Sequence, residues 1–170
     1  MAFFIPKNME FLPEVIEDYA TTHTTEESQL LAALNRETWA NVMIPRMLSG
    51  HLQGRILSLF SKLVNPENIL EIGTYTGYSA LCLAEGLKPN GSLHTLDNNE
   101  ECTSVANRYF KKSNFSKNLI QHIGDALEII PNLNYNFQLA FIDADKKNYS
   151  NYFDAIIEKM DIGGLIIADN

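Results

Sequence analysis

From residue 69 onward, short apolar runs alternate with longer amphipathic stretches, and this alternation constrains the fold more than any other feature of the sequence. The apolar runs cover residues 69–72, 93–97, 119–123, 139–142 and 165–168. Helical periodicity is found between them, at about 78–86, 99–112, 126–132 and 149–160. Because strands that alternate with helices form right-handed βαβ units, the pattern predicts an α/β fold, with a mostly parallel twisted sheet and helices on both faces.

The sequence before residue 65 has the pattern of helices. Thr24 and Glu27 have the spacing of a capping box, which predicts that a helix begins there. Pro45 is expected to end that helical pattern, because proline cannot continue a helix. We therefore expect an N-terminal helical appendage at 1–64, attached to an α/β domain at 65–170.

Composition excludes several classes of protein. The 170 residues suffice for one domain, and 21 Asp and Glu against 13 Lys and Arg give a net charge of −8, which makes nucleic-acid binding unlikely. The cysteines, Cys82 and Cys102, form no CxxC pair, which excludes a disulfide scaffold and a cysteine zinc site and fits a reducing compartment. No targeting or membrane-spanning segment is visible, so we expect a cytoplasmic protein without membrane contact.

The first apolar run leads into a glycine-bearing turn, EIGTYTGYS at 71–79. Ligands of open α/β sheets bind beyond the carboxyl ends of the strands. Gly73 and Gly77 would let the backbone turn tightly and approach such a ligand. The spacing is GxxxG, with Tyr75 where a dinucleotide site usually has its middle glycine. The alternative interpretation is a glycine-bearing turn that binds nothing.

Acidic residues end the next two runs. Asp97, 20 residues after Gly77, is suited to accept hydrogen bonds from both ribose hydroxyls of an adenosine group, although a helix N-cap is the alternative. Asp125 either caps the following helix or lies, with its turn, against an adenine ring. Together with the glycine turn, these residues predict a nucleoside site.

The last two runs end in oxygen ligands. Asp143 follows the fourth run, and Asp169 and Asn170 follow the fifth. Because consecutive strands tend to be neighbours, these side chains should meet at one edge of the sheet. Carboxylate and amide oxygens suit Mg²⁺, Mn²⁺ or Ca²⁺. The alternative is that the acids are only caps at the strand ends.

Other polar residues show no catalytic pattern. His94 and His122 lie inside expected strands and are interpreted as packing or surface residues rather than catalysts. Ser79 is not part of a GxSxG elbow, so a hydrolase triad is poorly supported. Tyr149 and Tyr152 are interpreted as packing residues of the last helix.

From about residue 47 to 170, the sequence resembles the class I S-adenosylmethionine-dependent O-methyltransferases of the cation-dependent caffeoyl-CoA and catechol type, and it looks like a bacterial member. The matching segments are ILEIGTYTGYSALCLAEGL, HTLDNNEE, GDALEIIP, FIDADKKNYSNYFD and GGLIIADN. The resemblance implies a Rossmann-like methyltransferase fold. It also implies methyl transfer to a hydroxyl of a catechol-like or phenylpropanoid acceptor, a small hydroxylated aromatic molecule, assisted by a divalent cation.

The resemblance also implies roles for individual positions. The residues expected to contact S-adenosylmethionine are Ser49, Glu71, Gly73, Thr74, Tyr75, Ser79, Asp97, Ala126 and Asp145. The expected metal ligands are Asp143, Asp169 and Asn170. Lys146 matches the lysine that acts as the base in catechol-type relatives, so Lys146 and Asp143 are the expected catalytic residues.

Such enzymes continue beyond the DN pair with a further helix and two strands. We therefore expect this chain to lack the C-terminal strands, to leave its last strand as an apolar edge, and to form a homodimer. Two alternatives to a methyltransferase remain open: a nicotinamide oxidoreductase, against which the GxxxG spacing and the DADK and DN motifs argue, and a non-catalytic S-adenosylmethionine-binding module.

Overall fold

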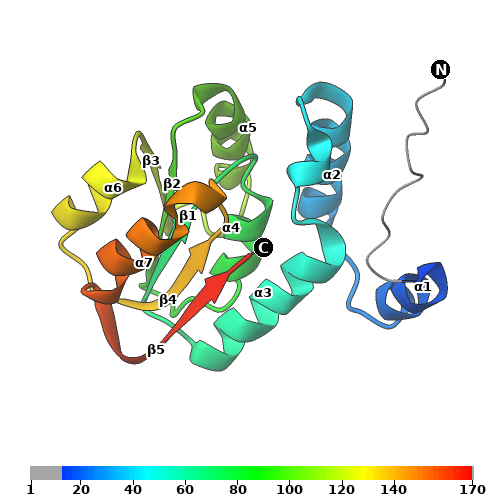
Figure 1. Cartoon of the computed structure of the whole chain (residues 1–170). Coiled ribbons are helices and arrows are strands. Elements are labelled where there is room, and N and C mark those ends of the chain that lie inside the picture. Colours follow the sequence, from blue (N-terminus) through cyan, green and yellow to red (C-terminus); the bar gives the residue numbers. More distant parts are fainter. Residues whose placement is uncertain (1–12, 170) are drawn as a thin grey trace, which may run out of the picture.

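A parallel sheet forms the centre of the computed structural model, which describes residues 13–169 (Figure 1). Its strands are β1 (Asn68–Ile72), β2 (Ser92–Asp97), β3 (Leu119–Ile123), β4 (Phe137–Ile142) and β5 (Met160–Ala168). They lie in the order β3-β2-β1-β4-β5, and every pair is parallel. The predicted α/β fold and its five strands are confirmed, because each apolar run forms a strand.

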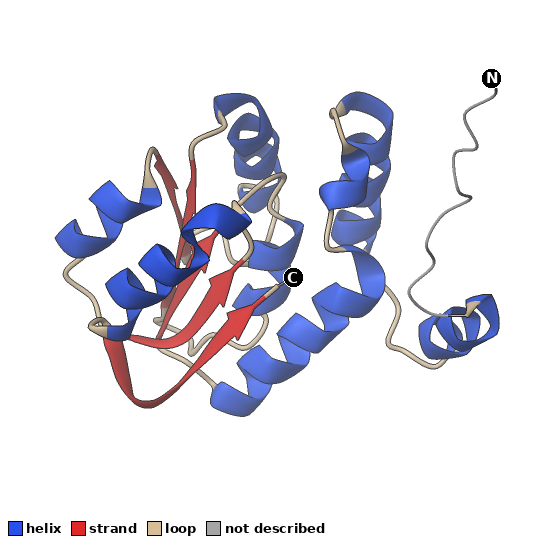
Figure 2. Cartoon of the chain, viewed as in Figure 1, coloured by secondary structure: helices blue, strands red, loops and turns tan. Residues whose placement is uncertain are grey.

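Helices cover both faces of the sheet, as the sequence predicts (Figure 2). The helices that connect the strands are α4 (Tyr78–Ala84), α5 (Glu100–Phe110), α6 (Ala126–Ile129) and α7 (Tyr149–Ile157), with the short 3₁₀ helices η2 (Ile130–Asn132) and η3 (Lys146–Asn148). No helix within residues 13–169 is long and apolar enough to cross a membrane.

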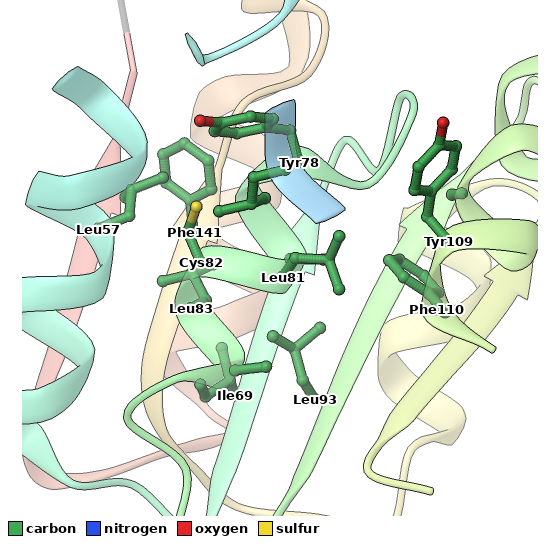
Figure 3. Packing of buried hydrophobic residues seen from close by; sticks show 14 of the residues in the cluster. Leu57, Ile69, Tyr78, Leu81, Cys82, Leu83, Leu93, Tyr109, Phe110 and Phe141 are labelled. Carbon is green, nitrogen blue, oxygen red and sulfur yellow. The ribbon is translucent and has the colours of Figure 1, made fainter. Parts of the chain in front are cut away.

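Each face of the sheet has its own hydrophobic cluster. On one face, alternate strand residues such as Ile69 and Phe141 pack against α4, α5 and the N-terminal helices (Figure 3). On the other face, the intervening residues, such as Leu70 and Ile142, pack against α6 and α7. Because β1 and β4 are covered on both sides, nearly all their residues are buried, and most of them are apolar.

The N-terminal helices are α1 (Glu14–Thr22), α2 (Gln29–Asn41), η1 (Pro45–Met47) and α3 (Gly50–Val64). The predicted capping box is wrong, because the N-cap of α2 is Ser28, whose hydroxyl accepts from the Leu31 amide at 3.2 Å. Thr24 instead donates to the carbonyl of Ala20 at the end of α1. Glu27, which precedes α2, accepts a hydrogen bond from the Tyr78 hydroxyl and so links the start of α2 to the sheet domain.

Helix α3 packs directly on α4. A Cβ atom at Gly54 would come within 2.8 Å of the Cys82 sulfur, so glycine is required for this close approach. Arg55 donates to both carboxylate oxygens of Glu85, at 2.8 and 3.0 Å, and hydrogen bonds from Arg55, Lys62 and the Ser58 hydroxyl outweigh desolvation and lower the pKa of Glu85 to about 2. The N-terminal helices also share the hydrophobic cluster of the sheet domain. The boundary between 64 and 65 stays a prediction.

The junction between α7 and β5 differs from the prediction. The helix expected at 149–160 ends at Ile157, and the strand expected at 165 already begins at Met160. Gly163 has a φ of +87°, and the pairing with β4 shifts register there. Polar and glycine residues interrupt the apolar pattern in the first half of β5, so the sequence does not predict that this half belongs to the strand.

Candidate functional site

A cavity of about 910 Å³ opens at the carboxyl ends of the strands. Its walls come from the loops that follow β1, β2, β3 and β4, and from the segment 41–49. This volume is in the range of small-molecule sites. Most of the predicted site residues line the cavity together: Ser49, Gly73, Thr74, Tyr75, Ser79, Asp97, Ala126, Asp143 and Asp145.

The turn after β1 has three residues with positive φ: Gly73 at +104°, Tyr75 at +47° and Gly77 at +88°. A Cβ atom at Gly73 would lie 1.9 Å from the carbonyl oxygen of Asp143, and one at Gly77 would strike the ring of Phe110. The tight turn predicted from the glycines is therefore present. Other atoms of the protein lie close to both glycines, so the fold requires these glycines whether or not a ligand approaches the turn.

Asp97 connects the ends of β1 and β2. Its carboxylate accepts hydrogen bonds from the backbone amides of Tyr75 at 2.7 Å and Asn99 at 2.9 Å. It is not the N-cap of α5, because that position is taken by Asn99, whose side-chain oxygen accepts from the Cys102 amide. The capping alternative for Asp97 is therefore wrong. A carboxylate has about four acceptor positions, so Asp97 keeps capacity to bind a ligand in the cavity.

Asp125 is a helix cap, as one of its two interpretations states. Its carboxylate accepts from the Leu127 amide at 2.8 Å and begins α6. Asp125 and Ala126 also line the cavity. Capping therefore orients this turn beside the cavity, and the two interpretations are compatible.

Glu71 lies behind the cavity wall rather than in its lining. The residue has no exposed surface, and its Oε2 atom accepts from the Thr95 hydroxyl at 2.5 Å. Thr74 lines the cavity, and its hydroxyl is 2.5 Å from the Thr95 hydroxyl. Burial, together with the negative charges of Asp143 and Asp97, raises the pKa of Glu71 to about 8, although hydrogen bonds from Ser79 and Thr95 oppose the shift.

Two acids meet where β4 and β5 end. Ile142 pairs with Ala168, so Asp143 and Asp169 leave the sheet at the same level on neighbouring strands. Burial and the charge of Asp169 raise the pKa of Asp143 to about 6, and Lys146 partly opposes this. Two carboxylates that repel each other at a polar edge are a fitting donor set for a hard divalent cation.

The third expected metal ligand, Asn170, lies outside the described residues. Within residues 13–169, no group of three or more His, Cys, Asp or Glu side chains has the arrangement of a metal site. The predicted set contains only two such side chains and one amide. The metal site therefore stays a prediction, which the adjacency of Asp143 and Asp169 supports.

Asp145 and Tyr152 form a hydrogen-bonded pair in the cavity wall. The Tyr152 hydroxyl donates to Asp145 at 2.5 Å, and the Asn148 side-chain amide donates to the other carboxylate oxygen at 2.7 Å. Burial and the Asp145 carboxylate raise the pKa of Tyr152 to about 12. Tyr152 is buried, as expected of a packing residue, but it also lines the cavity. Tyr152 lies in the first turn of α7, close to the DADK loop, and this position could have indicated that its side chain reaches the cavity.

The segment 41–49 was missed by sequence reasoning, apart from Ser49. It contributes Asn41, Val42, Met43, Ile44, Met47 and Leu48 to the cavity wall. The Tyr75 hydroxyl donates to the carbonyls of Met43 and Ile44, both at 3.3 Å, and so links this segment to the glycine turn. No motif marks the segment, because its contribution depends on the way the chain folds back over the sheet.

The histidines lie away from this cavity. His94 is buried, and its Nδ1 atom is 3.0 Å from Nε2 of His122. Burial and the neighbouring His122 lower the pKa of His94 to about 4, so it is neutral at neutral pH. The packing interpretation fits these contacts.

Comparisons with known proteins agree with this geometry. The family model described as O-methyltransferase matches residues 21–170. The chain is 35% identical over 149 residues to a catechol O-methyltransferase of Niastella koreensis, covering 85% of this chain and 66% of that protein. It is 32% identical over 150 residues to a caffeoyl-CoA O-methyltransferase of Stellaria longipes, covering 85% of this chain and 62% of that protein.

A solved structure has a similar fold. The O-methyltransferase TomG of Streptomyces achromogenes, in complex with SAM, superposes with a TM-score of 0.86 at 28% identity, covering 92% of this chain and 71% of that one. The chain spans 66% and 62% of the length of the two relatives named above, and about half of the length of further caffeoyl-CoA O-methyltransferases that it matches. A match to the family model over nearly the whole chain, with these relatives and the SAM-binding fold, leads to one conclusion: the chain belongs to the O-methyltransferase family.

Proposed function

We propose that this chain transfers a methyl group from S-adenosylmethionine to a hydroxyl of a catechol-like or phenylpropanoid acceptor, with the help of a divalent cation. The observation that carries the proposal is the cavity whose lining brings together the glycine turn, Asp97 and Asp143. Relatives named for catechol and caffeoyl-CoA methylation support the choice of acceptor. The solved complex of TomG with SAM supports the choice of methyl donor.

The residues around the cavity suit the parts of this donor. Asp97 would accept hydrogen bonds from the ribose hydroxyls, and Ala126 would lie beside the adenine. Ser49, Thr74 and Ser79 carry hydroxyls near the glycine turn, where they would hold the methionine part. By fixing the donor next to the Asp143 end of the cavity, these residues would supply the alignment on which methyl transfer depends.

Asp143 and Asp169, with Asn170, would hold the divalent cation. When bound, such a cation would supply Lewis-acid chemistry, lowering the pKa of an acceptor hydroxyl from a phenol value of about 10. Lys146 follows Asp143 closely in the chain and interacts with its charge. We assign Lys146 the task of accepting the proton of the hydroxyl that is methylated.

The donor assignment predicts the effect of Asp97→Ala. Loss of charge-assisted hydrogen bonds to the ribose should weaken binding of S-adenosylmethionine by roughly 1.5–3 kcal/mol, or about 10- to 150-fold. Isothermal titration calorimetry measures this change. Asp154→Ala, at an exposed position of α7, is the control and should bind normally. Unchanged affinity in Asp97→Ala, or tighter binding of NAD than of S-adenosylmethionine by the wild type, would contradict the assignment.

The base assignment predicts the effect of Lys146→Met. The turnover rate at neutral pH should fall by about 100-fold, at the lower end of what general bases contribute. Binding of S-adenosylmethionine should remain, because most of the proposed donor contacts come from other loops. The matched control is Lys147→Met, which removes the neighbouring exposed lysine and should leave turnover close to wild type. Equal rates for the two variants would show that another group accepts the proton.

We also propose that the chain forms a homodimer. Helix α3 presents an apolar stripe with the spacing of one helical face, and its members are 37–72% exposed: Ile56, Leu59, Phe60 and Leu63. Among the described strands, β5 pairs on one side only, with β4. Light scattering should give twice the mass of one chain, and Leu59→Lys should reduce it. A monodisperse monomer with a cooperative thermal transition would contradict the homodimer.

A further inference from the structure

Glu71 is a fully buried acid without an ion-pair partner among the residues described here. It has no exposed surface, and none of the ion pairs within residues 13–169 involves it. Its Oε1 atom is buried and has no hydrogen-bond partner of normal geometry, although the Ser79 hydroxyl is close enough to favour the anion. A lone buried carboxylate is costly, so the uncharged acid is the favoured form in the free protein.

The groups around Glu71 reinforce this preference. The titratable groups that interact with it are Asp97 at the end of β2, Asp143 at the end of β4, and the Cys82 thiol of α4. Both aspartates disfavour a further negative charge, and the raised pKa of Glu71, about 8, has this origin together with burial. Only hydroxyls, those of Thr95 and Ser79, favour its ionised form. Burial and the two neighbouring carboxylates therefore both favour the protonated form of Glu71, and a positive charge nearby would favour its anion.

The two forms of the proposed donor differ in charge at one atom. S-adenosylmethionine carries a permanent positive charge on its sulfonium, and S-adenosylhomocysteine, which is left after methyl transfer, has a neutral thioether. Both carry the ammonium and the carboxylate of the methionine part, whose charges oppose each other, so the sulfonium is the charge in which the two ligands differ. The cavity wall formed by Thr74 and Ser79 separates Glu71 from the place where we put the methionine part. Because Glu71 has no exposed surface, a charge held there would be screened less than at the protein surface.

We propose that Glu71 is a proton-linked residue that discriminates the charged methyl donor from its neutral product. Binding of the donor drives Glu71 from its neutral to its anionic form and releases one proton to solvent. Once the methyl group has left, the sulfonium charge is gone, and Glu71 takes a proton back. The proton of the acceptor hydroxyl leaves separately, so each turnover releases one proton in total. This inference rests on the proposed donor.

The sign of the pH dependence follows from linkage. Because donor binding releases a proton, affinity for S-adenosylmethionine should rise with pH and level off above about pH 8, where Glu71 is ionised in the free protein. Affinity for S-adenosylhomocysteine should change much less. Measurements above about pH 7 keep Asp143, whose pKa is about 6, ionised throughout. The ratio of the two affinities should therefore increase about tenfold per pH unit at most.

The experiment is isothermal titration calorimetry of both ligands, in buffers of different ionisation enthalpy, at about pH 7.3. Wild-type protein should release close to one proton with S-adenosylmethionine and far less with S-adenosylhomocysteine. Glu71→Gln keeps the size of the side chain and its acceptor for Thr95, but it should bind without proton release and with a smaller preference for the donor. Glu128→Gln, an exposed carboxyl of α6, is the matched control and should release protons as the wild type does.

Thr95→Val provides a test that keeps the acid. It removes the hydroxyl that donates to Glu71 at 2.5 Å, so the rise of donor affinity should move to higher pH. Donor binding without proton release in the wild type, or with full release in Glu71→Gln, would overturn the inference and leave the proposed function intact. Failure of the wild type to bind S-adenosylmethionine would overturn both.

Discussion

Replacing Gly73 with alanine should destabilise the protein more than any other single methyl added to its glycine turn. The new Cβ atom would lie 1.9 Å from the carbonyl oxygen of Asp143, which is backbone and cannot rotate away. The φ of +104° is also a conformation that alanine rarely adopts. We expect a loss of at least about 3 kcal/mol in the free energy of unfolding, because strain and overpacking add.

The chain offers a matched control for this prediction. Gly163 in β5 also has a positive φ, +87°, but a Cβ atom there would meet nothing within 4 Å. Gly163→Ala should therefore lower the free energy of unfolding only through the strained backbone conformation, by about 1 kcal/mol. Denaturant titration of both variants gives the two free energies. If Gly73→Ala is no less stable than Gly163→Ala, the contact between the β1 turn and the β4 end does not have the role given to it here.

Removing the charge of Asp143 should nearly abolish methyl transfer. Asp143→Asn takes away one of two anionic ligands proposed for the divalent cation, so turnover should fall at least about 100-fold, beyond the loss typical of a group that only supports a ligand. Binding of S-adenosylmethionine should fall less, because most of its proposed contacts come from the loops after β1, β2 and β3. Metal affinity, turnover and donor affinity are measured separately on the same protein.

The same substitution should not weaken the fold. With a folded pKa of about 6 against an ordinary value of 3.8, Asp143 binds its proton more tightly when folded. In cation-free buffer, its ionisation therefore lowers stability as pH rises from about 4 to 6, and Asp143→Asn should lack this loss. A variant that unfolds would contradict this stability prediction, and wild-type activity that survives excess EDTA would contradict the metal role.

The central strands of the sheet could be predicted because they are buried on both faces. β1 and β4 are mostly apolar for that reason, and their ends could be placed to within two residues. The start of β5 could not, because Gly163 and the register shift interrupt its pattern. The start of α2 could not either, since two residues near it, Thr24 and Ser28, are both suited to cap a helix.

Some residues of the candidate site could also be predicted from the sequence, and others could not. Asp97 and Asp143 were predictable because parallel strands bring their carboxyl ends to one edge, so sequence position already implies spatial proximity. The segment 41–49 was not, because only tertiary packing brings it over the cavity. The burial of Glu71 behind Thr74 was also beyond the sequence, because a strand pattern does not show whether a carboxylate faces a cavity or lies behind its wall.

The most direct test of the proposed function is detection of the methylated product. Purified protein is incubated with S-adenosylmethionine bearing a deuterated methyl group, Mg²⁺ and a catechol, and the products are analysed by mass spectrometry. The account predicts a catechol methyl ether that carries the deuterated methyl group, formed only with protein present and strongly reduced by EDTA or by Asp97→Ala. Protein that binds S-adenosylmethionine but forms no labelled ether with any catechol or phenylpropanoid acceptor would contradict the account.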